Sequence, residues 1–255
     1  MKIRKWLMMA FVLMFVAGTS QVWASSAAPG MSPDEALTLL KEGNARYVGN
    51  TAKHPNQDQD RRTLTTTKGQ HPYATVLGCS DSRVPPEVLF DAGIGDIFVI
   101  RVAGNVADTD ETGSIEYGVD HLGTPVLVVM GHTRCGAVTA VVQKAEVHGS
   151  IPALVANIKP AVAKAKAKSP GLGGDGLVEE AVKANVWQAV EDLLRTSQAL
   201  RDRAKAGTVK IVGAVYDIET GKIAWMGAHP DQDKLLAKYG KAGPKHGKSH
   251  GEKKK

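Results

Sequence analysis

Short apolar runs rich in β-branched residues recur along the middle of the chain, with room for a helix between them. Such runs are typical of strands that are buried on both faces of a parallel sheet. Four of them are predicted as parallel strands, at residues 74–78, 97–102, 125–130 and 209–216. The run at residues 223–226 follows a tight turn and is predicted as an antiparallel edge strand. Helical spacing of apolar residues predicts helices at 86–91, 111–122, 135–146, 151–168 and 177–206.

This pattern predicts an α/β fold: a central, mostly parallel sheet of four strands plus an antiparallel edge strand, flanked by helices, with an N-terminal helical arm. The arm begins at Ser32, which forms a capping-box sequence with Pro33 and Glu35. An apolar stripe continues this helix to about residue 48, and the polar residues 50–72 are predicted as an extended arm. Such a helix commonly packs on its own domain and less commonly on a second subunit.

The first 24 residues have the pattern of a secretory signal peptide. Three basic residues precede an apolar run from Trp6 to Ala17, and small residues lead to a cleavage position after Ala24. The run is shorter than the ~20 residues of a membrane-spanning helix, so cleavage is expected rather than an uncleaved anchor. We therefore expect an exported protein, periplasmic or secreted, with no stable membrane insertion after cleavage.

Composition and charge limit the class of protein and the kind of partner. The chain has 255 residues, of which 43% are hydrophobic and 23% charged, as in ordinary globular domains. Its net charge of +6 comes from the signal segment and from residues 241–255, and leaves residues 25–240 at −2. A body with this charge argues against a nucleic-acid partner. The predicted division is a signal peptide (1–24), a linker with helix and arm (25–72), an α/β domain (73–230) and a C-terminal segment (231–255) with a disordered Lys/His tail.

The two cysteines of the chain follow two of the predicted strands. Cys79 follows the first strand, and His132 and Cys135 follow the third. Because parallel strands end at the same edge of a sheet, these side chains are expected to meet there. Two thiolates and one imidazole make a three-ligand zinc set with an open fourth position, which is typical of catalytic zinc. The cysteines also fit a disulfide or two buried thiols, and His132 fits a hydrogen-bonded core histidine.

Two charged residues stand close to the first cysteine. Asp81 can take the fourth metal position or accept a proton from a metal-bound water. Arg83 can hold that carboxylate off the metal through a bidentate pair. Two charges in a strand-end loop need a partner, and this requirement favours a metal site over a disulfide.

The segments Cys-Ser-Asp-Ser-Arg at 79–83 and His-Thr-Arg-Cys-Gly at 132–136 resemble the two signature motifs of the β-class carbonic anhydrases. The similarity runs through about residues 32–227 and includes the segments 98–101, 113–117 and 212–217. Motif order, spacing and context all match, which favours zinc over the disulfide. Val76 stands where members with an inhibitory bicarbonate site have Trp, so no such site is expected.

The resemblance implies one Zn²⁺ per subunit, bound by Cys79, His132 and Cys135, and a catalytic pair of Asp81 and Arg83. It implies the reversible hydration of carbon dioxide to bicarbonate and a proton by attack of a zinc-bound hydroxide. Asp81 is also the candidate fourth zinc ligand in a closed state. The substrate pocket is expected to contain Gln70, which some members supply from the partner subunit, and Phe98, Tyr117 and Gly136.

The resemblance also implies a homodimer or a dimer of dimers. In that assembly the active site lies at the dimer interface, and the N-terminal helix packs on the neighbouring subunit. Relatives with the same zinc ligands hydrolyse carbonyl sulfide or carbon disulfide, which is the alternative enzymatic function. A non-catalytic exported zinc or disulfide module is the second alternative.

Overall fold

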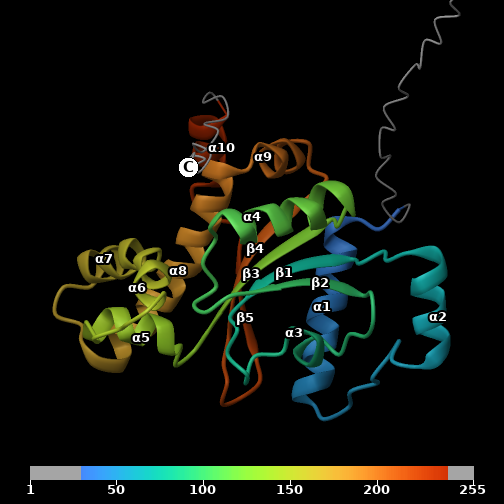
Figure 1. The fold of residues 1–255 in the computed structure, drawn as a ribbon, viewed down its shortest axis with the longest axis horizontal. Helices are drawn as coiled ribbons and strands as arrows, with labels where there is room; N and C mark the ends of the chain where they lie inside the picture. Colours follow the sequence, from blue (N-terminus) through green and yellow to red (C-terminus); the bar gives the residue numbers. More distant parts are fainter. Residues whose placement is uncertain (1–29, 241–255) are drawn as a thin grey trace, which may run out of the picture.

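The computed structural model describes residues 30–240 and has a five-stranded sheet at its centre (Figure 1). The strands are β1 (Ala74–Gly78), β2 (Ile97–Arg101), β3 (Val126–His132), β4 (Lys210–Tyr216) and β5 (Ile223–Gly227). Their order is β2-β1-β3-β4-β5; β5 is antiparallel to β4, and the other neighbours are parallel. The predicted α/β fold is confirmed. The predicted signal peptide (1–24) and the tail (241–255) lie outside the described residues.

Helices surround this sheet. They are α1 (Pro33–Val48), α2 (Gln59–Lys68), α3 (Pro86–Leu89), α4 (Thr109–Glu116), α5 (Gly136–Gln143), α6 (Ile151–Ala156), α7 (Lys159–Lys168), α8 (Gly174–Thr196), α9 (Gln198–Lys205) and α10 (Gln232–Tyr239), and the π-helix Tyr117–His121 continues α4. The predicted helices 151–168 and 177–206 are each divided in two, and α10 was not predicted. Ser197 makes the second division because its side chain accepts a hydrogen bond from the N–H of Leu200 and caps α9. No helix within residues 30–240 is long and apolar enough to cross a bilayer.

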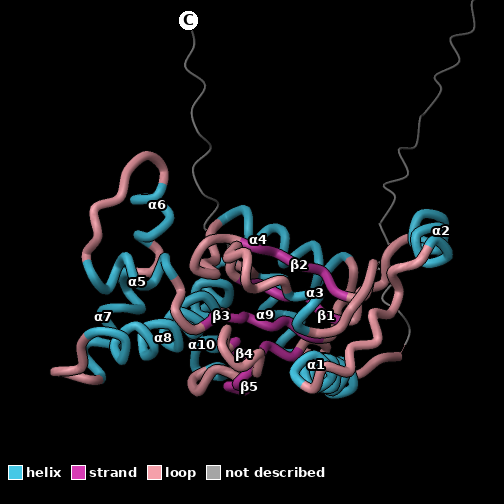
Figure 2. The backbone as a smooth tube through the Cα atoms, turned by 90° about the horizontal axis from the view of Figure 1, so that it is seen from below, coloured by secondary structure: helices cyan, strands magenta, loops and turns pink. Residues whose placement is uncertain are grey.

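Side chains of the central strands alternate between two apolar cores, one on each face of the sheet. On β3, Leu127 and Val129 belong to one core, and Val126, Val128 and Met130 belong to the other. Helices α4 and α8 pack in the first core, and α1 and α3 pack in the second. Figure 2 shows α1 and α4 on opposite sides of the strands. Because both faces are covered, every residue of β1 and β3 is buried, which explains their continuous apolar sequences.

Helix α1 begins with the predicted capping box and packs on its own chain. Ser32 and Glu35 each accept a hydrogen bond from the other's backbone N–H. Ala36 and Leu40, in the apolar stripe, are fully buried in the core that α1 shares with the sheet. The helix's own sheet therefore covers Ala36 and Leu40, and packing of its other faces on a neighbouring subunit stays a prediction.

The prediction of an extended arm over residues 50–72 is wrong for residues 59–68, which form α2. Asp58 caps this helix by accepting a hydrogen bond from the N–H of Arg61 at 2.7 Å. The guanidinium of Arg61 donates to the carbonyl of Ile94 and to the carboxylate of Asp96, so polar contacts hold α2 to the body. No residue of α2 is buried. The helix therefore lacks the apolar stripe from which a helix is predicted.

A buried carboxylate, Asp91, joins the N-terminal region to the sheet domain. It accepts a hydrogen bond from Nε of Arg46 at 2.6 Å and from the backbone N–H groups of Lys53 at 3.0 Å and His54 at 2.8 Å. Burial acts against the ionised form of Asp91, but these hydrogen bonds outweigh it and lower the pKa of the carboxyl. The carboxylate thereby fixes the segment after α1 on the loop that follows α3.

Asp91→Ala is expected to lower the free energy of unfolding by about 2–3 kcal/mol at neutral pH, because Arg46 and two backbone N–H groups lose their acceptor. The pKa of Asp91 is lower in the folded than in the unfolded chain. The contribution of ionised Asp91 to the free energy of unfolding is therefore complete above about pH 4, and it is lost as the pH falls through the folded-state pKa. Urea unfolding as a function of pH measures both effects.

The matched control is Asp34→Ala, which removes the exposed ion pair of Asp34 with Lys210. Its expected effect is below about 1 kcal/mol. Equal losses of stability in the Asp91 and Asp34 variants would contradict the anchoring role of Asp91.

Candidate metal centre

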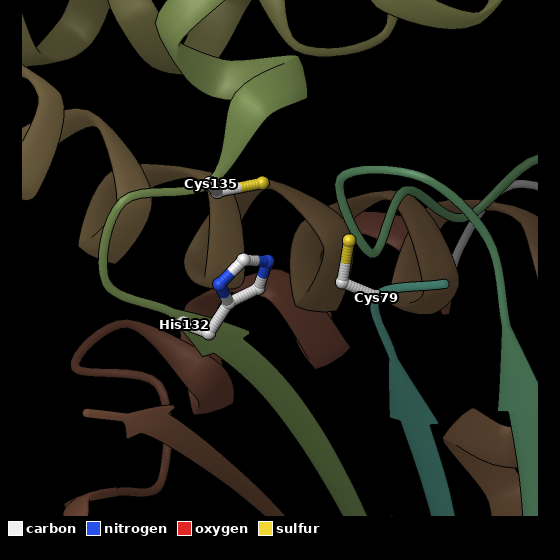
Figure 3. A group of neighbouring side chains, drawn as sticks. All are labelled: Cys79, His132 and Cys135. Carbon is white, nitrogen blue, oxygen red and sulfur yellow. The ribbon is translucent and has the colours of Figure 1, made fainter. Parts of the chain in front are cut away.

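The adjacent parallel strands β1 and β3 end at one edge of the sheet and place three soft metal ligands together. Cys79 directly follows β1, His132 is the last residue of β3, and Cys135 is the N-cap of α5. Leu77 is paired with Val129 in the register, so the two strands reach this edge side by side. Figure 3 shows both sulfur atoms and the imidazole of His132 turned toward one another.

The distances and the burial fit a metal ion. Sγ of Cys79, Sγ of Cys135 and a ring nitrogen of His132 all lie within 4.8 Å of one another. All three residues are buried, and both cysteines are free thiols rather than the two halves of a disulfide. The structure therefore brings together the three residues that the sequence indicates as metal ligands.

The contact of His132 with its neighbour selects its tautomer. Nδ1 lies 2.9 Å from the carbonyl oxygen of Thr133, and because a carbonyl only accepts, Nδ1 carries the proton. Nε2 then has a free lone pair, yet it is buried without a hydrogen-bond partner. A buried polar atom of this kind is costly unless a ligand occupies its lone pair. An imidazole nitrogen facing two thiols is a donor set that fits zinc.

The two sulfur atoms differ in their affinity for a proton. The hydrogen bond from Cys135 lowers the pKa of Cys79 to about 4, and the N–H of Gly104, 3.3 Å from the sulfur, contributes to this shift. The hydrogen bond to Cys79, followed by burial, raises the pKa of Cys135. A divalent cation at this position would favour two thiolates.

Arg83 holds the carboxylate of Asp81 beside this cluster. Its Nε and Nη2 donate to the two carboxylate oxygens at 2.9 and 2.7 Å, and its backbone N–H donates to Oδ1 at 3.0 Å. The side-chain hydrogen bond from Arg83 keeps the pKa of Asp81 well below its ordinary value. Oδ2 of Asp81 lies 3.8 Å from Nε2 of His132. An ionised carboxylate therefore faces the buried ligands.

Arg101, the last residue of β2, holds the backbone of the same loop. Its guanidinium donates to the carbonyl oxygens of Cys79 at 2.9 Å and of Asp81 at 2.6 Å. These bonds fix the chain on both sides of Ser80 and so set the directions of a metal ligand and of the carboxylate. The strand pattern places Arg101 at the end of an apolar run but gives no sign of this role.

A second support comes from residues that the sequence analysis does not identify. The amide of Asn185, on α8, donates to the carbonyl oxygen of Gly104 at 2.7 Å. Gly104, whose N–H contacts the Cys79 sulfur, has a φ of +75°. A Cβ at this position would lie 2.6 Å from Cδ1 of Ile158, so the close approach requires glycine. The signal for Asn185 is an amide within the apolar stripe of a long helix.

Of the predicted pocket residues, one adjoins the metal ligands and three lie toward the other end of β1. Gly136 is the first residue of α5 and adjoins Cys135. Phe98 pairs with Thr75 near the amino ends of β2 and β1, and its ring lies 5.8 Å from that of Tyr117. Gln70 is exposed in the segment that leads into β1. The length of β1, roughly 17 Å by strand geometry, separates this end of the sheet from Cys79.

Comparisons with known proteins agree on one family. Residues 74–223 match the family model of carbonic anhydrase. Carbonic anhydrase 2 of Mycobacterium tuberculosis is 38% identical over 201 residues, which cover 76% of this chain and 93% of that protein. The carbonic anhydrase of Mycolicibacterium smegmatis is 38% identical over 200 residues, which cover 76% of this chain and 94% of that protein.

Solved structures have the same fold. The β-carbonic anhydrase CafA of Aspergillus fumigatus matches with a TM-score of 0.63 and 26% identity, over 81% of this chain and 97% of its own. A tetrameric β-carbonic anhydrase of Sordaria macrospora matches in fold with a TM-score of 0.61 and 24% identity, over 73% of this chain and 94% of its own. Fold and sequence together define a carbonic anhydrase. The chain belongs to the β-carbonic anhydrase family.

Asn185→Asp is expected to weaken the site with little change of shape, because a carboxylate cannot donate to the Gly104 carbonyl. The buried carbonyl then loses its partner, and the free energy of unfolding falls by about 1–3 kcal/mol. We also expect about tenfold weaker binding of Zn²⁺, measured by competition with a chromogenic chelator. Asn157→Asp, at a half-buried position after α6, is the matched control. Unchanged zinc affinity in Asn185→Asp would remove Asn185 from the support of the site.

Proposed function

We propose that the protein catalyses the reversible hydration of carbon dioxide to bicarbonate and a proton, with one Zn²⁺ held by Cys79, His132 and Cys135. The observation that carries this proposal is the buried, unpartnered Nε2 of His132, which faces two free thiols. Three such ligands leave a fourth tetrahedral position for a reacting molecule, as in catalytic zinc sites. The family to which the chain belongs supports the same reaction.

When bound, zinc lowers the pKa of water from ~15.7 towards ~7 and so supplies a hydroxide nucleophile at neutral pH. The carboxylate of Asp81 accepts the hydrogen of the attacking oxygen and thereby turns a lone pair of that oxygen toward carbon dioxide. Arg83 keeps Asp81 ionised and fixed in direction. The side chains of Asp81 and Arg83 are 16% and 54% exposed, so this pair connects the buried ligands with solvent, which receives the proton.

We further propose that a second copy of the chain completes the substrate pocket. Gln70, Phe98 and Tyr117 lie toward the amino ends of β1 and β2, whereas Cys79 lies at the carboxyl end of β1. Gln70 and Tyr117 are exposed in the single chain. A homodimer, or a dimer of dimers, would place these residues against the partner's metal ligands and exclude water from the substrate. The related Sordaria macrospora enzyme is described as tetrameric.

We propose that residues 1–24 direct export and are then removed, which leaves a periplasmic or secreted enzyme. The support is the basic start, the apolar run and the small residues that end at Ala24. Mass spectrometry of the protein recovered from the periplasm or the medium tests this. A recovered protein that still begins with Met1 would contradict this proposal.

Arg83→Ala is expected to lower kcat/KM for carbon dioxide hydration by about 10- to 100-fold, because Asp81 loses the group that fixes its direction. Stopped-flow hydration with a pH indicator measures the change. The control is Arg134→Ala: Arg134 belongs to the second motif, but it is exposed and pairs with Glu219. Its activity should stay within about twofold of the parent protein. Full activity of Arg83→Ala would rule out the proposed role of the pair.

The purified protein is expected to contain one zinc ion per chain, and a chelator should abolish hydration until Zn²⁺ is restored. Cys135→Ser should lose most of its zinc because a neutral hydroxyl replaces a thiolate ligand. Ser82→Ala, at an exposed position of the Cys79 loop, is the control with unchanged zinc content. Elemental analysis and thiol titration give the readout.

Two outcomes would contradict the proposal. A protein with neither zinc nor free thiols would be a disulfide module. A zinc-loaded protein that releases sulfide from carbonyl sulfide faster than it hydrates carbon dioxide would be the alternative hydrolase.

A further inference from the structure

A groove unrelated to the metal ligands lies among α5, α6 and α7. These helices gather at the end of the molecule away from α2 (Figures 1 and 2). The groove has a volume of about 490 Å³, which is within the range of small-molecule sites. Its wall is mainly apolar and includes Val141, Ala145, Val147, Val155, Val162 and Ala163.

Helix α7 gives one side of the groove a regular pattern. Lys159, Val162, Ala163 and Lys166 have the spacing i, i+3, i+4 and i+7, so they share one face of the helix. Val162 is buried and forms part of the floor together with Val155. The face therefore has a lysine at each end and an apolar centre, over about two helical turns or ~10 Å.

The charged side chains that line the groove are all positive. Lys144, Lys159 and Lys166 line it, and no acidic residue does. None of these three lysines forms an ion pair within residues 30–240; the lysines that do lie elsewhere. Lys164, on another face of α7, pairs with Glu191 at 2.8 Å. The two faces of α7 thus differ. Lys164 on one face is ion-paired, whereas Lys159 and Lys166 on the groove face form no ion pair within residues 30–240.

We propose that this groove binds a free carboxylate with an unbranched apolar chain, of the fatty-acid type. The apolar wall would cover the chain, and the three lysines would neutralise the carboxylate at the rim. The segment 241–255 has a net charge of +5, so charge complementarity does not favour it as the occupant. Binding of a carboxylate in this groove is separate from carbon dioxide hydration and does not depend on the metal.

Titration of the full chain with dodecanoate, read by displacement of the fluorescent anion 1-anilinonaphthalene-8-sulfonate, tests the proposal. Saturable binding is expected, at least about tenfold tighter than that of dodecylammonium. The triple variant Lys144→Ala/Lys159→Ala/Lys166→Ala should bind dodecanoate about tenfold more weakly. The control Lys164→Ala/Lys168→Ala/Lys183→Ala makes the same change of net charge at ion-paired lysines and should stay within about twofold.

A second pair of variants tests the position of the ligand. Ala163→Trp fills the groove from an exposed position of α7 and should abolish binding, whereas Ala237→Trp, exposed on α10 and outside the groove, should not. Thermal unfolding checks that each variant folds, and carbon dioxide hydration should be unchanged in all of them. Equal binding by the two triple variants overturns the proposal. So does binding that survives Ala163→Trp, binding to anionic vesicles without binding of free dodecanoate, or self-association through this face.

Discussion

The parallel pairing of β1 with β3 is the constraint on which the site depends. It brings Cys79 to the same sheet edge as His132, and the helix that leaves β3 begins at Cys135. The apolar cores on both faces stabilise this sheet. They also keep water away from Cys79, His132 and Cys135. An imidazole nitrogen and two thiols in such surroundings need a partner, because burial without one is costly. The same packing that stabilises the fold therefore buries a nitrogen and two sulfurs for which a bound cation would be a partner.

The ligands are held through the backbone from two neighbouring elements. Arg101 approaches from β2 and binds the carbonyls of Cys79 and Asp81, and Asn185 approaches from α8 and binds the carbonyl of Gly104. The N–H of Gly104 then reaches the Cys79 sulfur. Support of this kind limits how far the ligands can move and stabilises negative charge on sulfur. The geometry of the three residues thus rests on contacts within the chain itself.

The sheet and the meeting of Cys79, His132 and Cys135 at one edge could be predicted because local patterns encode both. The strands are continuous apolar runs, and parallel topology alone brings their ends together. Helix α2 could not be predicted, since it makes polar contacts and has no buried face. Asn185 and Gly104 are 81 residues apart, and only the folded chain shows that they meet. The burial of Asp91 depends on similarly distant contacts, here with Arg46.

Two of the Asp–Arg pairs within residues 30–240, Asp91–Arg46 and Asp81–Arg83, show how burial gives the same chemistry different functions. The Asp91 side chain is 0% exposed and that of its partner Arg46 is 27% exposed, and backbone N–H groups occupy the remaining acceptor positions of Asp91. Such a carboxylate is an anchor, because any movement would leave a buried charge unpaired. Asp81 is partly exposed, its partner Arg83 is mostly exposed, and the pair lies beside an unpartnered nitrogen. Solvent lowers the cost of rearranging this pair. Asp81 is therefore the carboxylate suited to exchange hydrogen bonds with a reacting molecule, while Asp91 holds the framework in which it does so.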